Sequence, residues 1–527
     1  MSDDYDVIII GTGAGGGTLA HALAPTGKRI LLLDRGGYLP RERDNWDTTA
    51  VFVEGKYLPD ERWIDADTGH EFVPEQSYHV GGNTKFYGAA LFRLRPEDFG
   101  EITHFGGISP AWPVSYSEFE PWYAQAESLY HVHGKQGEDK TDGPRSAEFP
   151  YRAIVHEPRI QQLHDDLARL GLHPSHLPLG VKLDQDESGA PLRTSACIRC
   201  DRVDGFPCIV EAKADSEVIA VRPALEHPNV ELRLNTRVMR LETDASGRSV
   251  TAVVATAEDG SEVRLTASIV VVACGALNSA RLLLSSANDA HPRGLANSSD
   301  QVGRNYMRHN NVALMALSKD PNPTKLQKTL ARNEWYLKGD DWDYPMGGIQ
   351  MLGKADGEQL RGKAPHFLAW GAKLVPGGTL QDLAHHSVDF WLSSEDLPKA
   401  DNRLTVDKAG TVSLRVDPKN NVEGLQRLRK KFQSMLGDLG MHEGTHERKL
   451  YLHEAMDIGA TAHQAGTARF GTDAATSVLD TDCKTHDVDN LYVVDSSFFP
   501  SIGAVNPTLT IIANALRVGA VLADRRA

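Results

Sequence analysis

A glycine-rich segment directly after a short apolar run constrains the fold more than any other feature. Residues 6–10 read Asp-Val-Ile-Ile-Ile, which is typical of a strand buried on both faces, and residues 11–17 read Gly-Thr-Gly-Ala-Gly-Gly-Gly. A helical stretch follows and ends near Pro25, and a second strand at 29–33 leads to Asp34. This order of strand, glycine turn, helix, strand and acidic residue predicts a βαβ unit that binds a dinucleotide.

Each glycine of the predicted turn has its own task. Gly11 permits the tight turn, Gly13 lets the backbone approach a pyrophosphate, and Gly16 allows the helix to pack closely on the strand. Asp34 is placed to bind ribose hydroxyls, and we assign its neighbour Arg35 to the same cofactor site. Because an acidic residue disfavours a 2′-phosphate, NADP is disfavoured, and FAD and NAD remain.

Length and composition exclude several classes of protein. A chain of 527 residues is expected to form two or three domains, and its 41% hydrophobic and 24% charged residues are typical of a globular protein. The net charge is 56 − 71 = −15, without a basic stripe, so nucleic acid is not an expected partner. No positively charged leader and no run of 18 apolar residues is found. We therefore expect a cytoplasmic protein that does not span a membrane.

Three of the five cysteines form a C-x2-C-x7-C pattern. Cys197, Cys200 and Cys208 offer three thiolates for zinc or an iron–sulfur cluster, but a closed structural site needs four ligands and nothing nearby clearly completes the set. We expect a loop with free or occasionally paired thiols and no metal.

Later segments decide between the two cofactors. Residues 229–242 read as strand and turn, 267–275 as a buried strand, 277–284 as a helix and 491–495 as a final strand. A dinucleotide fold to which N-terminal, central and C-terminal segments all contribute is the pattern of flavoproteins. FAD is therefore the expected cofactor.

Motifs along most of the chain resemble one family. They are residues 11–16 with Asp34, 80–84 (Val-Gly-Gly-Asn-Thr), 112–118 (Trp-Pro-Val-Ser-Tyr-Ser-Glu), 235–238 (Asn-Thr-Arg-Val), 302–305 (Val-Gly-Arg-Asn), 463–466 (His-Gln-Ala-Gly) and 503–510 (Gly-Ala-Val-Asn-Pro-Thr-Leu-Thr). The sequence resembles the glucose-methanol-choline oxidoreductase family, and within its pyranose-oxidase-like branch it is most similar to bacterial glycoside 3-oxidases.

The resemblance implies an α/β architecture of two domains, as in p-hydroxybenzoate hydroxylase. One is a Rossmann-like FAD-binding domain, and the other is a substrate domain built on a mostly antiparallel sheet plus helices. We assign the FAD-binding domain to residues 1–100, 190–311 and 454–527, and the substrate domain to 101–189 and 312–453. Residues 353–362 are rich in glycine and charge and form a candidate lid within the substrate domain.

The family's catalytic pair corresponds here to His463 and Asn506. A neutral imidazole with a pKa near the working pH suits the removal of a hydroxyl proton while the C–H hydrogen leaves as hydride. Asn506 has a second interpretation, since Asn-Pro-Thr before an apolar helical pattern is also a helix start with asparagine at the cap. We expect Asn506 to serve both roles.

Further cofactor-binding positions follow from the same resemblance. They are Gly82, Asn83, Thr84, Val238, Gly275, Asp495, Asn506, Pro507 and Thr508. In pyranose 2-oxidases a histidine of the loop after the Gly-Gly pair bonds covalently to the flavin, whereas Phe86 falls at that place here. FAD is therefore expected to bind without a covalent bond, unless His79 replaces that histidine.

The expected activity is the FAD-dependent oxidation of a secondary hydroxyl of a pyranose or glycoside at C3, giving the 3-keto sugar. The electron acceptor is O2 or a quinone-type compound, and the sequence leaves this choice open. The alternatives are a pyranose 2-oxidase, another alcohol oxidase or dehydrogenase of the family, and a non-catalytic flavin-fold protein that binds or escorts other proteins.

Overall fold

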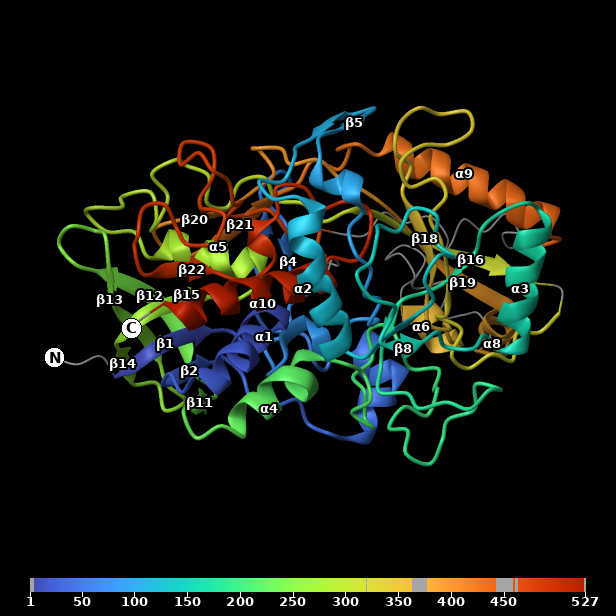
Figure 1. Ribbon diagram of the computed structural model, residues 1–527, viewed down its shortest axis with the longest axis horizontal. Coiled ribbons are helices and arrows are strands. Elements are labelled where there is room, and N and C mark those ends of the chain that lie inside the picture. The colour runs from blue at the N-terminus through green and yellow to red at the C-terminus, as the bar shows by residue number, and fades with distance from the viewer. Residues whose placement is uncertain (1–3, 319, 363–376, 442–457, 460–462, 526–527) are drawn as a thin grey trace.

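The computed structural model describes residues 4–318, 320–362, 377–441, 458–459 and 463–525. A parallel sheet of five strands organises one half of the molecule (Figure 1). Its order is β11 (Val230–Arg233), β2 (Ile30–Leu33), β1 (Tyr5–Ile10), β15 (Ala267–Val272) and β22 (Leu491–Val493). N-terminal, central and C-terminal segments therefore meet in one sheet, which confirms the predicted flavoprotein pattern.

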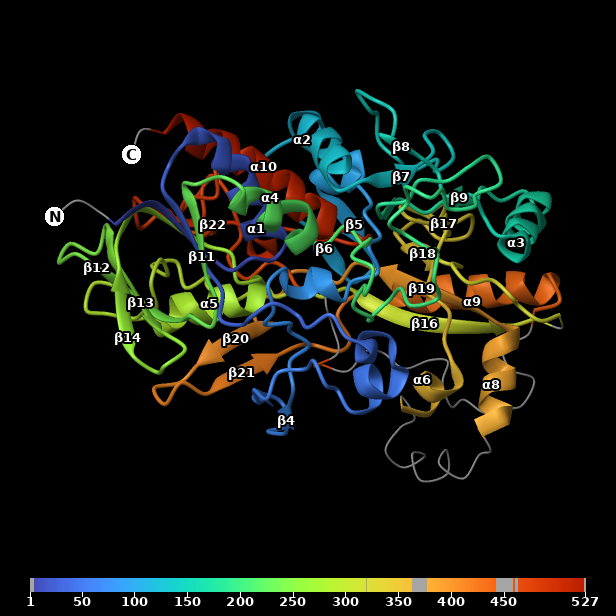
Figure 2. The ribbon, with the colours of Figure 1, turned by 90° about the horizontal axis from the view of Figure 1, so that it is seen from below.

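Helices cover this sheet and bring the two ends of the chain together. Helix α1 (Ala14–Leu23) lies beside α10 (Thr508–Asp524), and the two helices are seen together in Figures 1 and 2. They approach so closely that a Cβ added at Gly519 would lie 2.8 Å from the Cβ of Ala22. Glycine at this position is therefore needed for the helix contact. Helix α5 (Ala276–Ser285) directly follows β15.

A second sheet forms the other half of the molecule and is antiparallel (Figure 2). Its order is β16 (Asn310–Leu317), β19 (Ser387–Ser394), β18 (Gly348–Met351), β17 (Leu330–Arg332) and β9 (Ser175–His176). This arrangement confirms the predicted mostly antiparallel sheet.

The two faces of the antiparallel sheet have different surroundings. Side chains of β16 alternate, so that Val312 and Leu314 belong to a hydrophobic core with helices α3 (Pro158–Arg169) and α9 (Glu423–Asp438). On the opposite face, Asn311 is among the residues that line a large cavity. The sheet therefore has one face covered by helices and one face directed at the candidate site.

The remaining elements complete the two halves. They are α2 (Tyr116–Leu129), α4 (Arg222–Leu225), α6 (Gly357–Gly362), α8 (Gly377–His386), β3 (Trp63–Asp65), β4 (Glu71–Phe72), β5 (Ile102–His104), β6 (Gly107–Ser109), β7 (Val132–Gly134), β8 (Tyr151–Arg152), β10 (Leu179–Gly180), β12 (Arg237–Thr243), β13 (Val250–Thr256), β14 (Glu262–Leu265), β20 (Arg403–Val406) and β21 (Val412–Arg415).

The proposed domain limits stay a prediction, but two segments of the predicted substrate domain pack on the other half. Strand β20 contacts α5, where Leu404 shares a buried cluster with Leu277. Helix α2 contacts α10, and the hydroxyl oxygens of Tyr123 and Thr510 lie 2.8 Å apart. The two halves are therefore joined by side-chain contacts well away from the predicted limits.

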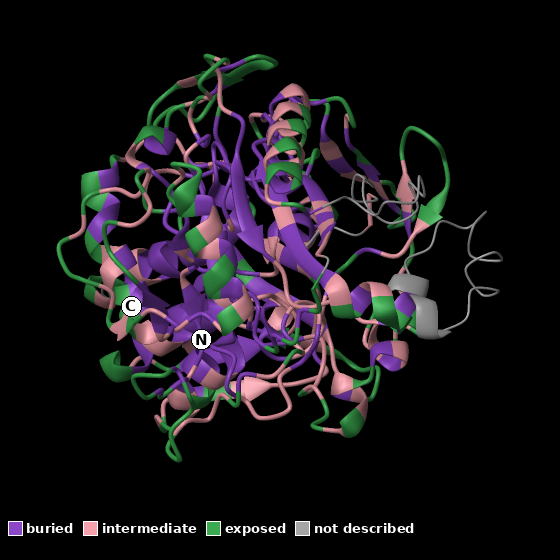
Figure 3. Cartoon of the chain, turned by 90° about the vertical axis from the view of Figure 1, so that its right-hand side faces the viewer, coloured by how far each residue is buried: buried purple, intermediate pink, exposed green. Residues whose placement is uncertain are grey.

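Buried residues occupy the central strands and the inward sides of the helices, while exposed residues lie on outer loops, outer helix faces and peripheral strands (Figure 3). Within the part of the chain that the structure describes, no helix has both the length and the apolar character needed to cross a bilayer.

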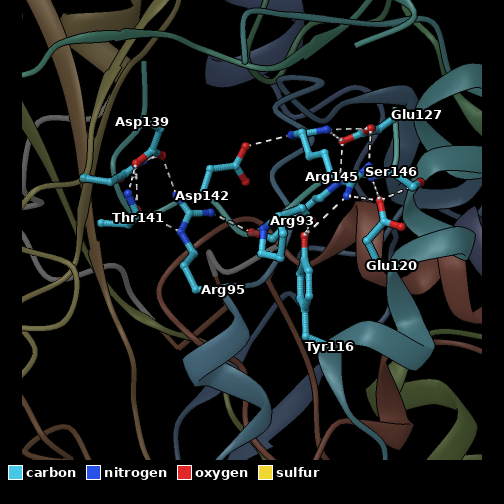
Figure 4. A network of polar contacts seen from close by, with 12 residues as sticks. Arg93, Arg95, Tyr116, Glu120, Glu127, Asp139, Thr141, Asp142, Arg145 and Ser146 are labelled. Carbon is cyan, nitrogen blue, oxygen red and sulfur yellow. Dashed lines mark hydrogen bonds and ion pairs between the residues drawn. The ribbon is translucent and has the colours of Figure 1, made fainter. Parts of the chain in front are cut away.

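A buried network of ion pairs fastens α2 to the loop at 139–146 (Figure 4). The guanidinium of Arg93 donates to both carboxylate oxygens of Glu127, at 2.8 and 2.7 Å, and to Glu120 at 2.8 Å. Arg145 donates to the same Glu127 carboxylate at 2.8 Å. The side chains of Arg93 and Glu127 are 0% and 1% exposed, so Glu127 is a carboxylate shared by two cations that are removed from water, with Glu120 and Asp142 as their further partners.

Replacing Glu127 by glutamine should lower the free energy of unfolding by about 3–5 kcal/mol, because Arg93 and Arg145 would keep their charges without their shared carboxylate. Chemical denaturation of the FAD-loaded protein measures the change. Glu187→Gln is the matched control, since Glu187 is a fully exposed partner of Arg152 and its loss should leave the free energy of unfolding nearly unchanged. Equal stability of the two variants would contradict this interpretation of the network.

Candidate active site

A cavity of about 1110 Å³ runs from the glycine turn after β1 to the inner face of the antiparallel sheet. It is larger than the usual small-molecule pocket of about 300–1,000 Å³, as expected for a site that holds a dinucleotide together with a second molecule. All the predicted site residues except Gly16 line it. They are Gly11, Gly13, Asp34, Arg35, Gly82, Asn83, Thr84, Val238, Gly275, His463, Asp495, Asn506, Pro507 and Thr508.

The glycine turn leaves room where a phosphate would lie. Gly11 has a φ of +105°, and a Cβ there would lie 2.3 Å from the carbonyl oxygen of Ala273. A Cβ at Gly16 would lie 2.0 Å from the carbonyl oxygen of Gly11, so this glycine serves helix packing. A Cβ at Gly13, in contrast, would meet nothing within 4 Å. The backbone at Gly13 thus faces open space at the start of α1, which fits a pyrophosphate.

Asp34 directly follows β2, and neighbouring groups of the cavity wall fix its carboxylate. Its carboxylate accepts hydrogen bonds from the hydroxyl of Thr12 and from the backbone N–H of Gly36, the latter at 3.1 Å. Burial raises the pKa of Asp34, and these two hydrogen bonds oppose the rise. The guanidinium of Arg35 lies 3.7 Å above the ring centre of Tyr78. The acidic and basic residues are therefore fixed at the cavity wall before a ligand enters.

A second turn closes over the glycine turn. Gly82, with a φ of +55°, lies so near Gly13 that an added Cβ would be 3.2 Å from its Cα. The side chain of Asn83 accepts from the backbone of Ser77 at 2.7 Å, and the hydroxyl of Thr84 donates to the carbonyl of Gly81 at 2.5 Å. These bonds hold the turn at 82–85 against the predicted phosphate position.

Asp495 joins the ends of two neighbouring strands. One oxygen of its carboxylate accepts from the backbone N–H of Gly275 at 3.0 Å and from the hydroxyl of Ser279 at 2.5 Å. The other oxygen accepts from the backbone of Ser497 at 2.8 Å. Asp495 thereby positions the start of α5 and the chain that leads from β22 toward Asn506.

His463 and Asn506 lie together at the other end of the cavity. The Nε2 of His463 and the Nδ2 of Asn506 are 3.3 Å apart, and the Oδ1 of Asn506 accepts from the Nε2 of Gln350 at 2.7 Å. The expectation that Asn506 caps the last helix is wrong. Helix α10 begins one residue later, with Pro507 at its cap position and no side-chain cap. The Asn506 amide instead turns across the cavity to β18.

The pKa of His463 differs from the expectation, whereas its neutral charge state at neutral pH is the expected one. Burial, followed by the nearby ammonium of Lys328, lowers its pKa to about 4, whereas a value near the working pH was predicted. Lys328 itself pairs with Asp204, and both residues line the cavity. The imidazole is therefore neutral at neutral pH and can accept a proton on its unprotonated nitrogen.

Several cavity residues had no signal in the sequence. Gln350 and Trp391 reach the cavity from β18 and β19, and Lys328 reaches it from the chain before β17. The alternation of side chains along a strand predicts which residues share a face with Gln350. It does not predict that this face meets Asn506, which only the fold shows.

The candidate lid lies along the same cavity. Gly353, Lys354 and Gln359 line it, and the backbone of Gly353 donates to Asp204 at 2.6 Å. Asp356 pairs with Arg202 at 2.7 Å. The side chains from 360 to 362 lie outside the described residues, so the function of this segment as a lid stays a prediction.

Phe86, which falls where pyranose 2-oxidases carry their flavin-linked histidine, lines the cavity. His79 is not among the lining residues, and its ring lies 6.4 Å from those of Phe86 and Tyr57, measured between centres. This arrangement supports FAD binding without a covalent bond, which stays a prediction.

The three clustered cysteines are free thiols. Burial raises the pKa of Cys197 to about 11 and also raises that of Cys200, so both thiols are protonated at neutral pH. Across the described ranges, no group of three or more His, Cys, Asp or Glu residues is arranged to hold a metal ion.

Comparison with known proteins defines the class. The N- and C-terminal sequence profiles of GMC oxidoreductases match residues 179–311 and 398–515. The chain is 30% identical to 6'''-hydroxyparomomycin C oxidase of Streptomyces lividus, covering 99% of this chain and 92% of that protein. It is 28% identical to the fructose dehydrogenase large subunit of Gluconobacter japonicus, covering 98% of each.

A solved structure has the same fold. The crystal structure of pyridoxine 4-oxidase from Mesorbium loti superposes with a TM-score of 0.68 at 17% identity, over 99% of this chain and 100% of that one. The chain belongs to the GMC oxidoreductase family. It is an FAD-dependent oxidoreductase that acts on CH–OH groups, and the open space at Gly13 fits this cofactor.

Replacing Gly13 by valine should abolish FAD binding, because the new side chain would fill the open space at the pyrophosphate position. The flavin absorbance of the purified variant measures this loss. Gly437→Val is the matched control, since Gly437 in α9 also faces open space but lies outside the cavity. A Gly13→Val protein that stays yellow would remove the basis for this assignment.

Proposed function

We propose that the protein oxidises a secondary hydroxyl of a pyranose or glycoside to the ketone, at C3. The observation that carries the proposal is the neutral His463, whose Nε2 lies beside Asn506 in a cavity shared with the cofactor-binding turn. The C3 position rests on the resemblance of the sequence to bacterial glycoside 3-oxidases. O2 or a quinone-type compound serves as the final electron acceptor.

The residues around His463 divide the chemistry between them. His463 Nε2 accepts the hydroxyl proton, and Asn506 holds the reacting alcohol beside it. Bound FAD supplies the acceptor for the hydride. Breaking the O–H and C–H bonds together converts the alcohol carbon to a carbonyl, and the proton remains on the imidazole.

The cavity also offers a partner for a second hydroxyl. The Oε1 of Gln350 is buried and, among the described residues, has no hydrogen-bond partner, while its Nε2 donates to Asn506. An unpaired buried acceptor is costly unless a ligand satisfies it. A hydroxyl next to the reacting carbon would do so, which supports a polyhydroxylated substrate.

Replacing His463 by alanine should keep the protein folded and yellow but slow flavin reduction about 10²–10⁴-fold, which is the usual contribution of a positioned base. Anaerobic stopped-flow mixing with a glycoside measures the rate. Because the pKa of His463 is about 4, reduction in the parent protein should slow as the pH falls through about 4, where the imidazole becomes protonated. The alanine variant should lack this dependence.

His486→Ala is the control, because His486 bonds Ser477 at 2.9 Å and lies outside the cavity lining. If flavin reduction in His463→Ala is within a few-fold of the control, His463 is only a structural histidine and the proposed base is wrong.

The product formed from a glucoside should be the 3-keto compound, as identified by NMR of the reaction mixture. Two observations favour other positions. A segment of 62 residues is 46% identical to pyranose 2-oxidase of Tricholoma matsutake, and another relative is named paromamine 6'-oxidase. A product oxidised at C2 or C6 would overturn the C3 assignment and leave the oxidation of a sugar hydroxyl in place.

A further inference from the structure

A second histidine lies directly behind His463. The Nδ1 atoms of His309 and His463 are 3.0 Å apart, and the two rings meet at 86°. His309 is 3% exposed and precedes β16. Neither the sequence motifs nor the comparisons assign it a role. The contact therefore needs an explanation in terms of the proton that His463 receives.

The backbone holds His309 in a strained conformation. Its φ is +63°, in the left-handed region that is unfavourable for a non-glycine residue. The carboxylate of Asp396 accepts from the backbone N–H groups of Arg308 and His309, at 3.0 and 2.8 Å. Strain of about 1–3 kcal/mol persists only where the surroundings fix the conformation, and it concentrates at functional sites.

The contact of Asn506 with Gln350 favours one placement of the ring protons. Gln350 donates to the Oδ1 of Asn506, which leaves the Nδ2 of Asn506 to donate to the Nε2 of His463. The Nε2 of His463 is thus an acceptor, and a neutral ring then carries its proton on Nδ1. That N–H points at the Nδ1 of His309, which must be unprotonated to accept it. The His309 proton is therefore on Nε2.

We propose that His309 is the positioning residue for His463 and the first acceptor of its proton. By accepting the Nδ1–H of His463, it keeps the Nε2 of His463 unprotonated toward the substrate. When Nε2 takes the hydroxyl proton, the Nδ1–H bond of His463 breaks and an Nδ1–H bond forms on His309. The pair gains one proton and one positive charge, and the inference rests on the proposed function of His463.

One charged group acts on each histidine of the pair. Lys328 disfavours a positive charge on His463, whereas the carboxylate of Glu395 favours one on His309. Glu395 is itself fixed, since it pairs with His104 at 2.9 Å and accepts from the hydroxyl of Ser109 at 2.9 Å. The charge of Glu395 lowers the cost of a positive charge on His309, although burial and His463 keep the pKa of His309, about 3, below the value of about 4 for His463.

The remaining groups define the resting state. Burial and the neighbouring His463 lower the pKa of His309 to about 3, so both rings are neutral before the reaction. Next to Glu395, burial raises the pKa of Asp98 to about 7, and the pKa of Asp396 is raised to about 6. At neutral pH the pair is therefore uncharged before the substrate delivers a proton.

The test compares His309→Gln, His309→Ala and the double variant His309→Ala/His463→Ala, all loaded with FAD. Anaerobic flavin reduction by methyl glucoside gives the rates across a range of pH. Glutamine can accept the Nδ1–H of His463 but cannot take a proton, so His309→Gln should be about tenfold slower and His309→Ala about 10²-fold slower. The double variant should be no slower than His463→Ala alone, because the two residues act as one unit.

A second measurement does not depend on turnover. NMR of protein labelled with 15N at histidine reports which ring nitrogen carries the proton. The signals of His463 are those that the His463→Ala variant lacks. The parent should show the proton on Nδ1, and His309→Ala should lose that preference. His156→Gln is the control, because His156 is a buried histidine that bonds Thr329 outside the cavity.

The outcomes separate the two proposals. A proton on Nε2 of His463 in the parent, or a His309→Gln rate equal to that of the control, would overturn the role of His309 while leaving His463 as the base. A double variant much slower than His463→Ala would show that His309 acts only through folding. If the flavin of His463→Ala is reduced as fast as that of the parent, the proposed role of His463 is wrong, and the role of His309 that rests on it is wrong as well.

Discussion

The parallel pairing of β22 with β15, in which Val271 lies opposite Tyr492, returns the C-terminal segment to the sheet that the N-terminus begins. The end of β22 lies so close to the first turn of α1 that a Cβ at Gly15 would be 1.9 Å from the carbonyl oxygen of Val494. This contact requires glycine. From it the chain continues through Asp495 to Asn506, so the pairing of one short strand brings half of the reacting pair into the cavity that begins at the glycine turn.

The position of His463, the other residue of the reacting pair, depends on the antiparallel sheet. The inner face of the antiparallel sheet supplies Gln350, which orients Asn506, and His309 at the start of β16 contacts the ring of His463. The reacting end of the cavity is therefore an interface between two halves with different architectures. Lys328 disfavours a positive charge on His463 and Glu395 favours one on His309, so the same interface keeps the base neutral and lowers the cost of a charge on the histidine behind it.

The sequence predicted the parts of the structure that local patterns determine. The strand at 6–10, the glycine turn and the acidic Asp34 are close in sequence, and each follows from backbone geometry or burial. The Asn506 cap was wrong because a side chain from another sheet competes for its amide. The contact of His309 with His463 joins residues 154 positions apart, and no periodicity connects them. The resemblance to a family identified His463, but only the fold shows what lies behind it.

Deuterium placed at C3 of methyl glucoside tests the central claim most directly. The account predicts that flavin reduction is slowed by deuterium at C3 and not by deuterium at C2 or C6, because the C3–H bond breaks beside His463 and Asn506. Equal rates for the C3-labelled and unlabelled sugar, with slowing by deuterium at another carbon, would contradict it.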